Sequence, residues 1–329
     1  MISVQDLSKK YSRNLAVDHI SFEVQKGEIV GFLGPNGAGK TTTMRMLTCF
    51  LPPTSGTASV AGFDVLEEPL EVKRRIGYLP ETPPLYPEME TDEYLTFVGR
   101  LKGLSSAELP KRVDYACERC SITDVRKKLL GKLSKGYRQR VGLAQAIIHN
   151  PDVLILDEPT AGLDPKQINE TRDLIRSLAG DHTIILSTHI LPEVEQTCEK
   201  VIIINKGKLV ATDSVENLQA RARGAESMLV EVAGRNGALD SGTVRSRLER
   251  IGGVSRVALK DTRDSRATFQ VETQKGFIRG DLARAVVESG WDLNELRATA
   301  VSLEEIFLQL TAQGSDVESS KPAAQVKSA

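Results

Sequence analysis

Residues 34–41 read Gly-Pro-Asn-Gly-Ala-Gly-Lys-Thr, a spacing that matches the phosphate-binding pattern G-x-x-x-x-G-K-[ST]. The apolar stretch EIVGFLG precedes this loop and TTTMRML follows it, which is the strand–loop–helix setting that such a loop requires. The loop glycines let the backbone turn tightly, so that its N–H groups and the start of the helix face phosphate oxygens. The residues expected to bind phosphate are Gly34, Pro35, Asn36, Gly37, Ala38, Gly39, Lys40, Thr41 and Thr42.

Three side chains of this segment have distinct expected roles. Lys40 should reach the β- and γ-phosphates of a nucleotide, Thr41 should supply a hydroxyl to Mg²⁺, and Thr42 should contact the α-phosphate. The alternative is a glycine-rich turn without a ligand, and the flanking strand and helix patterns argue against it.

An acidic pair and a histidine follow two later apolar runs. Asp157 and Glu158 end the run VLIL at 153–156, where a buried strand that points at phosphate would bring both carboxylates to the nucleotide. Asp157 suits Mg²⁺, and Glu158 suits activation of the attacking water. His189 follows the run 183–188, so it can bond the γ-phosphate at the same sheet edge. The alternatives are an acidic strand cap and a surface histidine, and both are disfavoured beside a phosphate loop.

The composition narrows the class of partner. The 329 residues include 43 Lys and Arg and 44 Asp and Glu, a net charge of −1, which argues against nucleic acid as the main partner. Apolar runs are shorter than the roughly 20 residues that span a bilayer, and MISVQDLSKKY lacks the apolar core of a signal peptide. We therefore expect a cytoplasmic protein that reaches a membrane only through a partner. Cys117 and Cys120 form a C-x-x-C pattern, but they fall on the apolar stripe of a predicted helix, which favours burial over metal or redox chemistry.

Strand and helix patterns alternate from residue 1 to about 222, as in an α/β domain. The expected strands are 2–7, 17–24, 28–33, 57–61, 75–79, 153–157, 183–188 and 200–205, with a turn at 54–56. The expected helices follow Lys40 and then cover about 91–103, 105–120, 137–148, 165–178 and 191–198. Ser105 and Glu108 have the spacing of a capping box. Residues 91–148 contain helices without clear strands, which predicts a helical subdomain inserted in the sheet domain.

The pattern changes near residues 221–224. Strands are expected at 227–233, 254–260, 266–272 and 292–298, and helices at 240–251 and 277–289. This βαββαβ order predicts a small ferredoxin-like α+β domain over 225–313. A last helix is expected from Ser302, with Glu305 completing a capping box, and the small polar residues 314–329 should be disordered.

The segment between the two nucleotide motifs carries a family resemblance. It reads LSKGYRQR at 133–140, followed by VGLAQAIIHNPDVLILDEPTAGLD. This run resembles the signature and catalytic strand of the ATP-binding subunits of ABC transporters, and the resemblance covers residues 1 to about 222. It implies the phosphate-loop NTPase fold of an ABC ATPase, ATP and Mg²⁺ as ligands, and ATP hydrolysis. It also implies a head-to-tail dimer, in which the phosphate loop of one subunit and the signature of the other enclose each ATP.

Further site residues are implied by this resemblance alone. Ser134 and Gly136 would contact the γ-phosphate bound to the opposite subunit, and Asp164 would contact the partner across the dimer. Tyr11, in SKKYSRNLAV, stands where the family stacks an aromatic ring on adenine, and an exposed loop tyrosine is the alternative. Glu81 stands near the position of a family glutamine, and its carboxylate can still bind ATP-bound Mg²⁺ or orient water.

Two departures from the family pattern point to a subgroup. Lys135 and Tyr137 flank the single Gly136 of the signature, and Glu81 replaces the glutamine. Both features, and the C-terminal SLEEIFLQLT, resemble exporter ATPases whose permease is a separate chain, such as drug-resistance, gliding-motility and copper-site assembly transporters. The implied partners are an integral-membrane permease and a second copy of the chain or a homologous ATPase subunit. The chain would then lie on the inner face of the cell membrane.

The expected function is therefore ATP-driven export through a separate permease, gripped by residues 81–95. The alternative is a soluble ABC ATPase of translation or DNA repair. Those proteins usually carry two nucleotide domains in one chain, or a long coiled-coil or zinc insertion, and this sequence has neither pattern. A third hypothesis, a nucleotide-binding regulator without hydrolysis, is disfavoured by the complete set of predicted catalytic residues.

Overall fold

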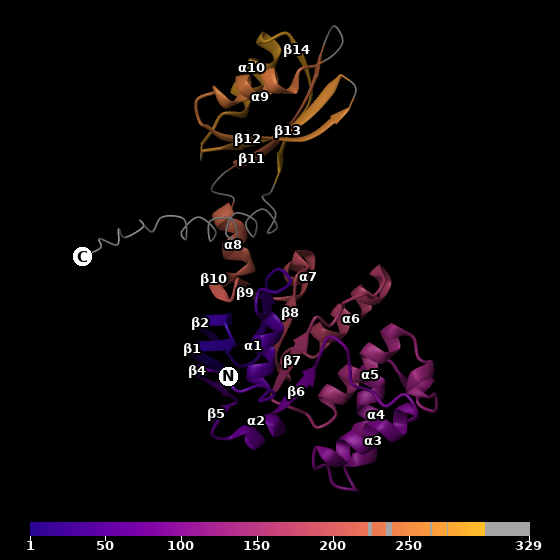
Figure 1. The fold of residues 1–329 in the computed structure, drawn as a ribbon. Coiled ribbons are helices and arrows are strands. Elements are labelled where there is room, and N and C mark those ends of the chain that lie inside the picture. Colours follow the sequence, from indigo (N-terminus) through magenta and orange to yellow (C-terminus); the bar gives the residue numbers. More distant parts are fainter. Residues whose placement is uncertain (223–225, 235–238, 264, 275, 300–329) are drawn as a thin grey trace, which may run out of the picture. The chain divides into compact units, whose positions relative to one another are not determined.

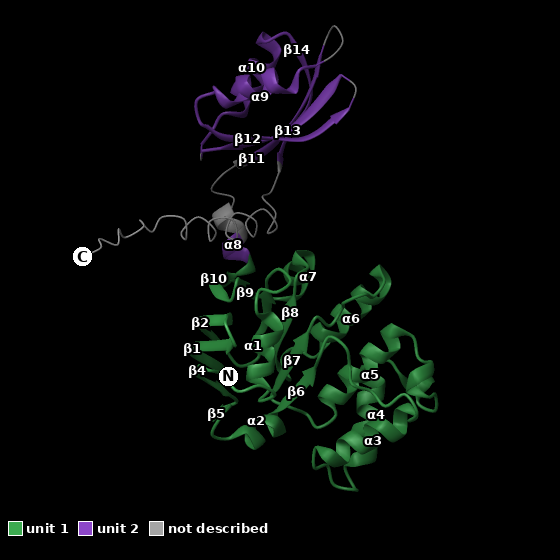
Figure 2. Cartoon of the chain, viewed as in Figure 1, with its two compact units in different colours: residues 1–215, 310–329 green, residues 216–309 purple. Residues whose placement is uncertain are grey.

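The computed structural model describes residues 1–222, 226–234, 239–263, 265–274 and 276–299. These residues form two compact units, divided after Val215 (Figure 1, Figure 2). The helix predicted from Ser302 and the tail predicted at 314–329 lie outside the described residues.

The first unit is built on a six-stranded sheet with the strand order β10-β9-β3-β8-β7-β6. Its strands are β3 (Ile29–Leu33), β6 (Ile76–Leu79), β7 (Val153–Asp157), β8 (Thr183–Thr188), β9 (Lys200–Asn205) and β10 (Lys208–Ser214). Neighbouring strands are parallel except for β9 and β10, which are antiparallel. The carboxyl ends of β3, β7 and β8 therefore meet at one edge, where the phosphate loop, Glu158 and His189 follow them.

The central strands are apolar on both faces. Every residue of β3, β7 and β8 is buried, without the alternation of a half-exposed strand. Such continuous burial is typical of parallel strands that are covered on both sides, and it explains why their apolar runs were readable from sequence.

A second, antiparallel sheet has the order β2-β1-β4-β5. Its strands are β1 (Ile2–Tyr11), β2 (Asn14–Val24), β4 (Ser55–Val60) and β5 (Phe63–Asp64). Helix α1 (Lys40–Leu47) contacts strands of both sheets, and its Met44 and Leu47 belong to the same buried core as Val4 and Phe32. The helix that begins at the phosphate loop is thus held between the two sheets.

Three helices, α3 (Thr91–Leu101), α4 (Leu109–Arg119) and α5 (Lys135–Ile147), pack against one another (Figure 1). Short 3₁₀ turns, η1 (Thr123–Val125) and η2 (Leu130–Lys132), stand between α4 and α5. The predicted start of the second helix at 105 was wrong. The expected hydrogen bonds form, since Ser105 N–H donates to Glu108 and Glu108 N–H donates to Ser105 Oγ at 3.3 Å. However, the α-helix begins at Leu109, which keeps Pro110 in the first turn where its missing N–H costs nothing.

The remaining helices of the first unit are α2 (Pro69–Arg75), α6 (Pro165–Ser177) and α7 (Leu191–Thr197). Helix α8 (Val215–Ala222) starts at the last residue before the division and belongs otherwise to the second unit. Among the helices that the structure describes, none is both long and apolar enough to cross a membrane.

The sequence patterns missed α2, β5, β10 and α8 and misplaced one turn. Lys206 and Gly207 both have positive φ and join β9 to β10, the geometry of a tight hairpin turn. Strand β10 is only partly buried, so its sequence lacks the apolar run that marks the central strands. The turn expected at 54–56 instead contains the start of β4, and Gly56 has φ +79° within that strand.

The second unit contains β11 (Glu226–Gly234), α9 (Ser241–Glu249), β12 (Val254–Arg263), β13 (Arg266–Thr273), α10 (Arg279–Glu288) and β14 (Trp291–Thr299). This is the βαββαβ order that the sequence predicts. The strands pair antiparallel in the order β12-β13-β11-β14. One face of the sheet packs on both helices through a core that includes Val230, Phe269, Leu248 and Leu282.

Candidate nucleotide site

The phosphate loop joins β3 to α1, and two of its glycines stand where a larger residue would clash with neighbouring backbone atoms. A Cβ at Gly34 would lie 2.5 Å from the carbonyl oxygen of Ile204, and one at Gly39 would lie 2.6 Å from that of Ala16. Gly37 and Gly39 also have φ of +79° and +108°, which side-chain-bearing residues rarely adopt. The loop therefore holds its shape only with glycine at these positions.

Lys40, the first residue of α1, is buried with its ammonium turned back toward the loop. Its Nζ donates to the carbonyl oxygens of Gly34 at 2.8 Å and Pro35 at 3.3 Å, and it lies 3.2 Å from Glu158 Oε1. The side chains of Lys40 and Glu158 are only 6% and 9% exposed. A cation and a carboxylate from distant parts of the unit's sequence thus meet at the loop.

Thr41 and Asp157 are brought together by the sheet. Thr41 Oγ1 donates to Asp157 Oδ1 at 3.2 Å, and Asp157 is 1% exposed at the end of β7. Ser187 on the neighbouring strand β8 also donates to Asp157 Oδ1. Sequence reasoning missed Ser187, because its role depends on the register that pairs it with Asp157.

Glu158 follows β7 in a left-handed conformation, with φ +49°. Its backbone N–H donates to the carbonyl oxygen and to Oγ of Ser187, both at 3.1 Å, which holds this uncommon geometry in place. Its side chain accepts from His189 Nδ1 at 2.9 Å through Oε2, while Oε1 faces Lys40. The carboxylate therefore has a fixed orientation, and His189, 45% exposed, forms its open side.

A cavity of about 340 Å³ lies above the loop. It is lined by Ala16, Asn36, Gly37, Gly39, Lys40, Thr41, Thr42, Glu81, Glu158, Ala161 and His189. Most residues predicted from sequence for the bound nucleotide therefore share one cavity. Glu81 comes from the segment after β6. Ala16, in β2, and Ala161 were not anticipated, since an alanine side chain carries no chemical signal.

Tyr11 and the signature residues lie elsewhere in the same chain. Tyr11 ends β1, its side chain is 43% exposed, and Lys9 Nζ lies 5.6 Å from its ring centroid. Ser134 and Gly136 do not line the loop cavity as far as the structure describes it. Ser134 is the N-cap of α5, and its Oγ accepts from Tyr137 N–H at 3.3 Å. Because this cap forms, α5 begins at Lys135, two residues before the predicted start.

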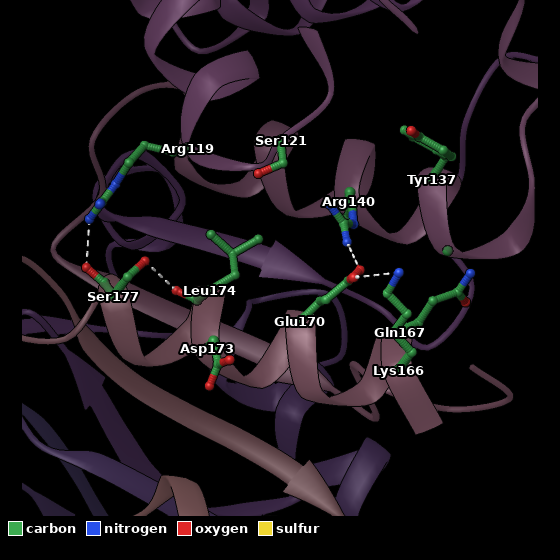
Figure 3. Close-up of a pocket in the computed structure, with 11 residues that line it drawn as sticks. Arg119, Ser121, Tyr137, Arg140, Lys166, Gln167, Glu170, Asp173, Leu174 and Ser177 are labelled. Atoms are coloured by element: carbon green, nitrogen blue, oxygen red, sulfur yellow. Dashed lines mark hydrogen bonds and ion pairs between the residues drawn. The ribbon is translucent and has the colours of Figure 1, made fainter. Parts of the chain in front are cut away.

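Gly136 opens onto a second cavity, of about 710 Å³, between α5 and α6. Figure 3 shows Arg140 of α5 facing Glu170 of α6 across this space, where the two side chains form an ion pair. Arg119 reaches the carbonyl oxygen of Ser177 at 2.5 Å. These contacts connect the group of three helices to α6 beside the signature residues.

Two neighbours of the signature have roles within the chain. The Lys135 ammonium occupies the space beside Gly162, since a Cβ added there would lie 2.2 Å from Lys135 Nζ. Asp164, expected at a partner contact, is the N-cap of α6, with Oδ1 accepting from Gln167 N–H at 3.0 Å.

A third cavity, of about 380 Å³, lies beside β6 and the last turns of α3 and α5 and is called here the Lys102 groove. It is lined by Arg45, Phe50, Gly77, Tyr78, Pro80, Thr82, Pro84, Lys102, Gln145, Ala146 and His149. Phe50 is 72% exposed on its wall. Lys102 Nζ donates to the carbonyl oxygens of Lys73 at 2.9 Å and Ile76 at 3.2 Å, and His149 Nε2 bonds the same Ile76 oxygen at 3.0 Å.

The positive charge of this groove comes from Arg45 and Lys102, whereas His149 is uncharged at neutral pH. Burial, reinforced by Lys73, lowers the pKa of Lys102 to about 8. Burial, and then the charge of Lys102, lower the pKa of His149 to about 4. Among the lining residues that the structure describes, none is a carboxylate. An acidic group from another chain would find complementary charge there.

Cys117 and Cys120 are both fully buried, in α4 and at its C-cap. Burial raises the pKa of the Cys117 thiol to about 11, and the pKa of Cys120 is also raised by burial. Both side chains therefore pack as apolar groups in this structure.

Comparison with known proteins agrees with this geometry. The family model described as ABC transporter matches residues 17–161. The chain is 36% identical to the bacitracin transport ATP-binding protein BcrA of Bacillus licheniformis, over 95% of this chain and 98% of that protein. It is 33% identical to the daunorubicin/doxorubicin resistance ATP-binding protein DrrA of Streptomyces peucetius, over 98% and 96% of the two chains. A solved ATP-binding subunit of an ABC transporter has a TM-score of 0.62 and 31% identity, covering 67% of this chain and 92% of that one.

The fold and the site define an ABC-type nucleotide-binding protein. With relatives of this identity over almost their whole length, the chain belongs to the family of ABC transporter ATP-binding subunits. Nothing in these comparisons favours a soluble ABC ATPase of translation or DNA repair.

Proposed function

We propose that this chain binds and hydrolyses ATP with Mg²⁺ and thereby drives export through a separate membrane permease. The observation that carries the proposal is the convergence of Lys40, Thr41, Glu158 and His189 on one cavity at the phosphate loop. On this proposal residues 1–222 form the nucleotide-binding domain and residues 225–313 form an accessory domain.

The oxygen atoms beside the loop fit a magnesium ion. Thr41 Oγ1 and Asp157 Oδ1 lie 3.2 Å apart, and hydroxyl and carboxylate oxygens are ligands that Mg²⁺ prefers. Glu81 adds a carboxylate to the same cavity. When bound, the ion would neutralise charge on the phosphate oxygens.

Three side chains of the loop cavity would have different roles in the hydrolysis of ATP. On binding of ATP, the Lys40 ammonium can exchange its contact with Glu158 for phosphate oxygens, because both partners are within reach of the loop. Glu158 is then free to accept a proton from the attacking water. His189 bonds the other oxygen of that carboxylate and so orients it toward the γ-phosphate.

The signature residues support a dimer. Ser134 and Gly136 stand at the start of α5, whose first-turn N–H groups can donate hydrogen bonds to an anion. They lie away from the loop cavity of their own chain, so a nucleotide would join them to the loop of a second subunit. A dimer of this kind would close with ATP and open after hydrolysis, which is a way to switch a permease between two states.

The Lys102 groove is the favoured docking surface for the permease, adjoining the predicted grip at 81–95. Its Phe50 wall gives apolar area, and the cations Arg45 and Lys102 give charge complementarity for an acidic partner segment. The chain would then sit in the cytoplasm, peripheral to the inner face of the membrane.

A paired measurement tests the nucleotide chemistry. ATPase turnover and ATP-dependent dimerisation by light scattering are measured for the wild type, Glu158→Gln and the exposed-site control Glu199→Gln. We expect Glu158→Gln to lower turnover by roughly 10²-fold or more and to accumulate an ATP-bound dimer, with the control unchanged. If Glu158→Gln hydrolyses ATP at the wild-type rate, Glu158 is not the general base. If the wild-type protein binds ATP but does not hydrolyse it, a nucleotide-binding regulator is favoured.

A second experiment tests the transport role. The chain is used as bait in native membranes, and co-purifying integral-membrane proteins are identified with and without ATP. Recovery of a permease supports export and identifies the cargo class. Recovery of ribosomes or DNA-repair proteins without a membrane protein would move the chain to the soluble class.

A further inference from the structure

Glu193, in the first turn of α7, is a buried carboxylate that the chemistry above does not use. The residue is 6% exposed. Its Oε1 accepts from Thr160 Oγ1 at 2.6 Å, and its Oε2 accepts from Thr188 Oγ1 at 2.9 Å. An ionised carboxylate can only accept, so both hydroxyls donate to it. No ion pair with Glu193 is recorded among the described residues, which makes these two hydroxyls its direct support.

The two threonines belong to the two loops that carry the catalytic pair. Thr160 stands two residues after Glu158, and Thr188 is the last residue of β8, directly before His189. Both are almost fully buried, at 4% and 0% exposed. Thr188 Oγ1 also accepts from Ile190 N–H at 3.0 Å. The hydrogen-bonded bridge Thr160–Glu193–Thr188 is therefore tied to the backbone on both sides of His189.

The bridge begins where the backbone contacts of the strands end. The last ladder pair of β7 and β8 is Asp157 and Ser187, and Glu158 N–H still bonds Ser187. The β7–β8 ladder ends at that pair, and the Glu158 and His189 side chains just beyond it meet at 2.9 Å. The carboxylate of Glu193 joins the segments that follow β7 and end β8, because it accepts hydrogen bonds from both Thr160 and Thr188.

We propose that Glu193 is a positioning residue for hydrolysis, which fixes the separation and orientation of Glu158 and His189 through Thr160 and Thr188. It does not line the loop cavity as far as that cavity is described, so it acts through other residues and not on ATP. The predicted effect of Glu193 on the rate of ATP hydrolysis rests on the proposed function. The predicted placement of His189 can be measured without hydrolysis.

The kinetic test compares Glu193→Ala, Glu193→Gln and Glu199→Ala, the last removing an exposed acid from the same segment. Loss of a group that orients a catalytic residue typically costs 10–100-fold. We expect Glu193→Ala to lower kcat by roughly that factor, with the KM for ATP and the ATP affinity changed less than about twofold. Glu193→Gln should recover much of kcat because its amide can still bond both hydroxyls. Glu199→Ala should match the wild type.

A spectroscopic test is independent of hydrolysis. The chain has four histidines, so the ring signals of ¹³C-labelled His189 can be assigned by difference with His189→Gln. We expect Glu193→Ala and Thr188→Val to shift the His189 ring signals, and Glu199→Ala to leave them unchanged. If Glu193→Ala is too poorly folded, Thr160→Val and Thr188→Val serve as substitutes, and their effects on kcat should be less than additive.

The outcomes separate this inference from the proposed function. The positioning role would be overturned if folded Glu193→Ala showed unchanged His189 signals. It would also be overturned if the decrease in kcat equalled the fraction of the variant that is unfolded. A wild-type chain that binds ATP but does not hydrolyse it would remove the proposed function, while shifted His189 ring signals in Glu193→Ala would still support the positioning role of Glu193.

Discussion

Lys40 Nζ and Glu158 Oε1 lie 3.2 Å apart in the nucleotide cavity, and each side chain is less than one tenth exposed. The residue expected to bind phosphate and the residue expected to activate water therefore neutralise each other before a nucleotide arrives. Removing one member of a buried pair leaves a charge without compensation, which is costlier than removing both.

This pairing predicts a strong coupling between two substitutions. In the absence of nucleotide, Lys40→Met should lower the free energy of unfolding by about 3 kcal/mol, because it strands the Glu158 carboxylate. Adding Glu158→Gln to Lys40→Met should restore a part of that loss, giving a coupling of about 1–3 kcal/mol in urea unfolding. Strictly additive effects would contradict the pairing.

The contact between Thr41 and Asp157 predicts a change in metal requirement. Asp157→Asn and Thr41→Ala should raise the Mg²⁺ concentration for half-maximal ATPase activity, each by roughly 10-fold or more, since each removes an oxygen ligand or its orienting partner. Thr41→Ser keeps the hydroxyl and serves as the matched control. Mg²⁺ titrations of ATPase rate provide the measurement, and identical midpoints in all variants would rule out these ligands.

The positive charge of the Lys102 groove predicts a charge-sensitive contact with the permease. Lys102→Glu should weaken co-purification of the permease by roughly 10-fold or more, since it removes a complementary charge and adds a repulsive one. Phe50→Ala should weaken it by loss of apolar contact. Basal ATPase activity of the isolated chain should remain near the wild-type value in both. The control is Lys111→Glu, an exposed charge reversal on α4, and equal retention by all three would place the contact elsewhere.

The depressed pKa of His149 predicts a dependence of stability on pH. Its folded-state pKa of about 4 lies below the ordinary value of 6.5, because burial and Lys102 disfavour the imidazolium. The unfolded chain therefore binds more protons between these values, so stability is complete above pH 6.5 and falls as the pH decreases toward 4. Between pH 7.5 and 5 this residue should cost about 2 kcal/mol.

The measurement is urea unfolding of the wild type and His149→Gln at both pH values. Glutamine can still donate to the Ile76 carbonyl but does not titrate, so the variant should lose about 2 kcal/mol less over the same interval. Equal losses would show that His149 is not the group responsible.

The position of Ser134 predicts an effect on dimerisation beyond its effect on stability. Ser134→Ala should cost about 1 kcal/mol through loss of the N-cap of α5. In the Glu158→Gln background it should also abolish ATP-dependent dimerisation measured by light scattering. The control is Ser105→Ala, which removes the hydrogen bond from Glu108 N–H to Ser105 Oγ just before α4. This variant should dimerise normally. Normal dimerisation of the Ser134 variant would exclude a contact with nucleotide across the dimer.

The local sequence was sufficient for the phosphate loop and the central strands. The spacing of residues 34–41 encodes the loop because its glycines meet local steric needs, and the apolar runs of β7 and β8 encode buried parallel strands. Helix starts were less readable. Pro110 and the Ser134 cap each moved a boundary, since one proline or one hydrogen bond outweighs weak helical periodicity.

The tertiary structure decided which of these side chains meet. Thr41 and Asp157 are separated by 116 positions, yet they bond because β3, β8 and β7 lie side by side in parallel register. The same register brings Ser187 to Asp157, and the packing of α7 brings Glu193 to two threonines that no motif links to it. A sequence pattern specifies the neighbours along the chain, whereas pairings across a sheet depend on the register of strands that are distant in sequence.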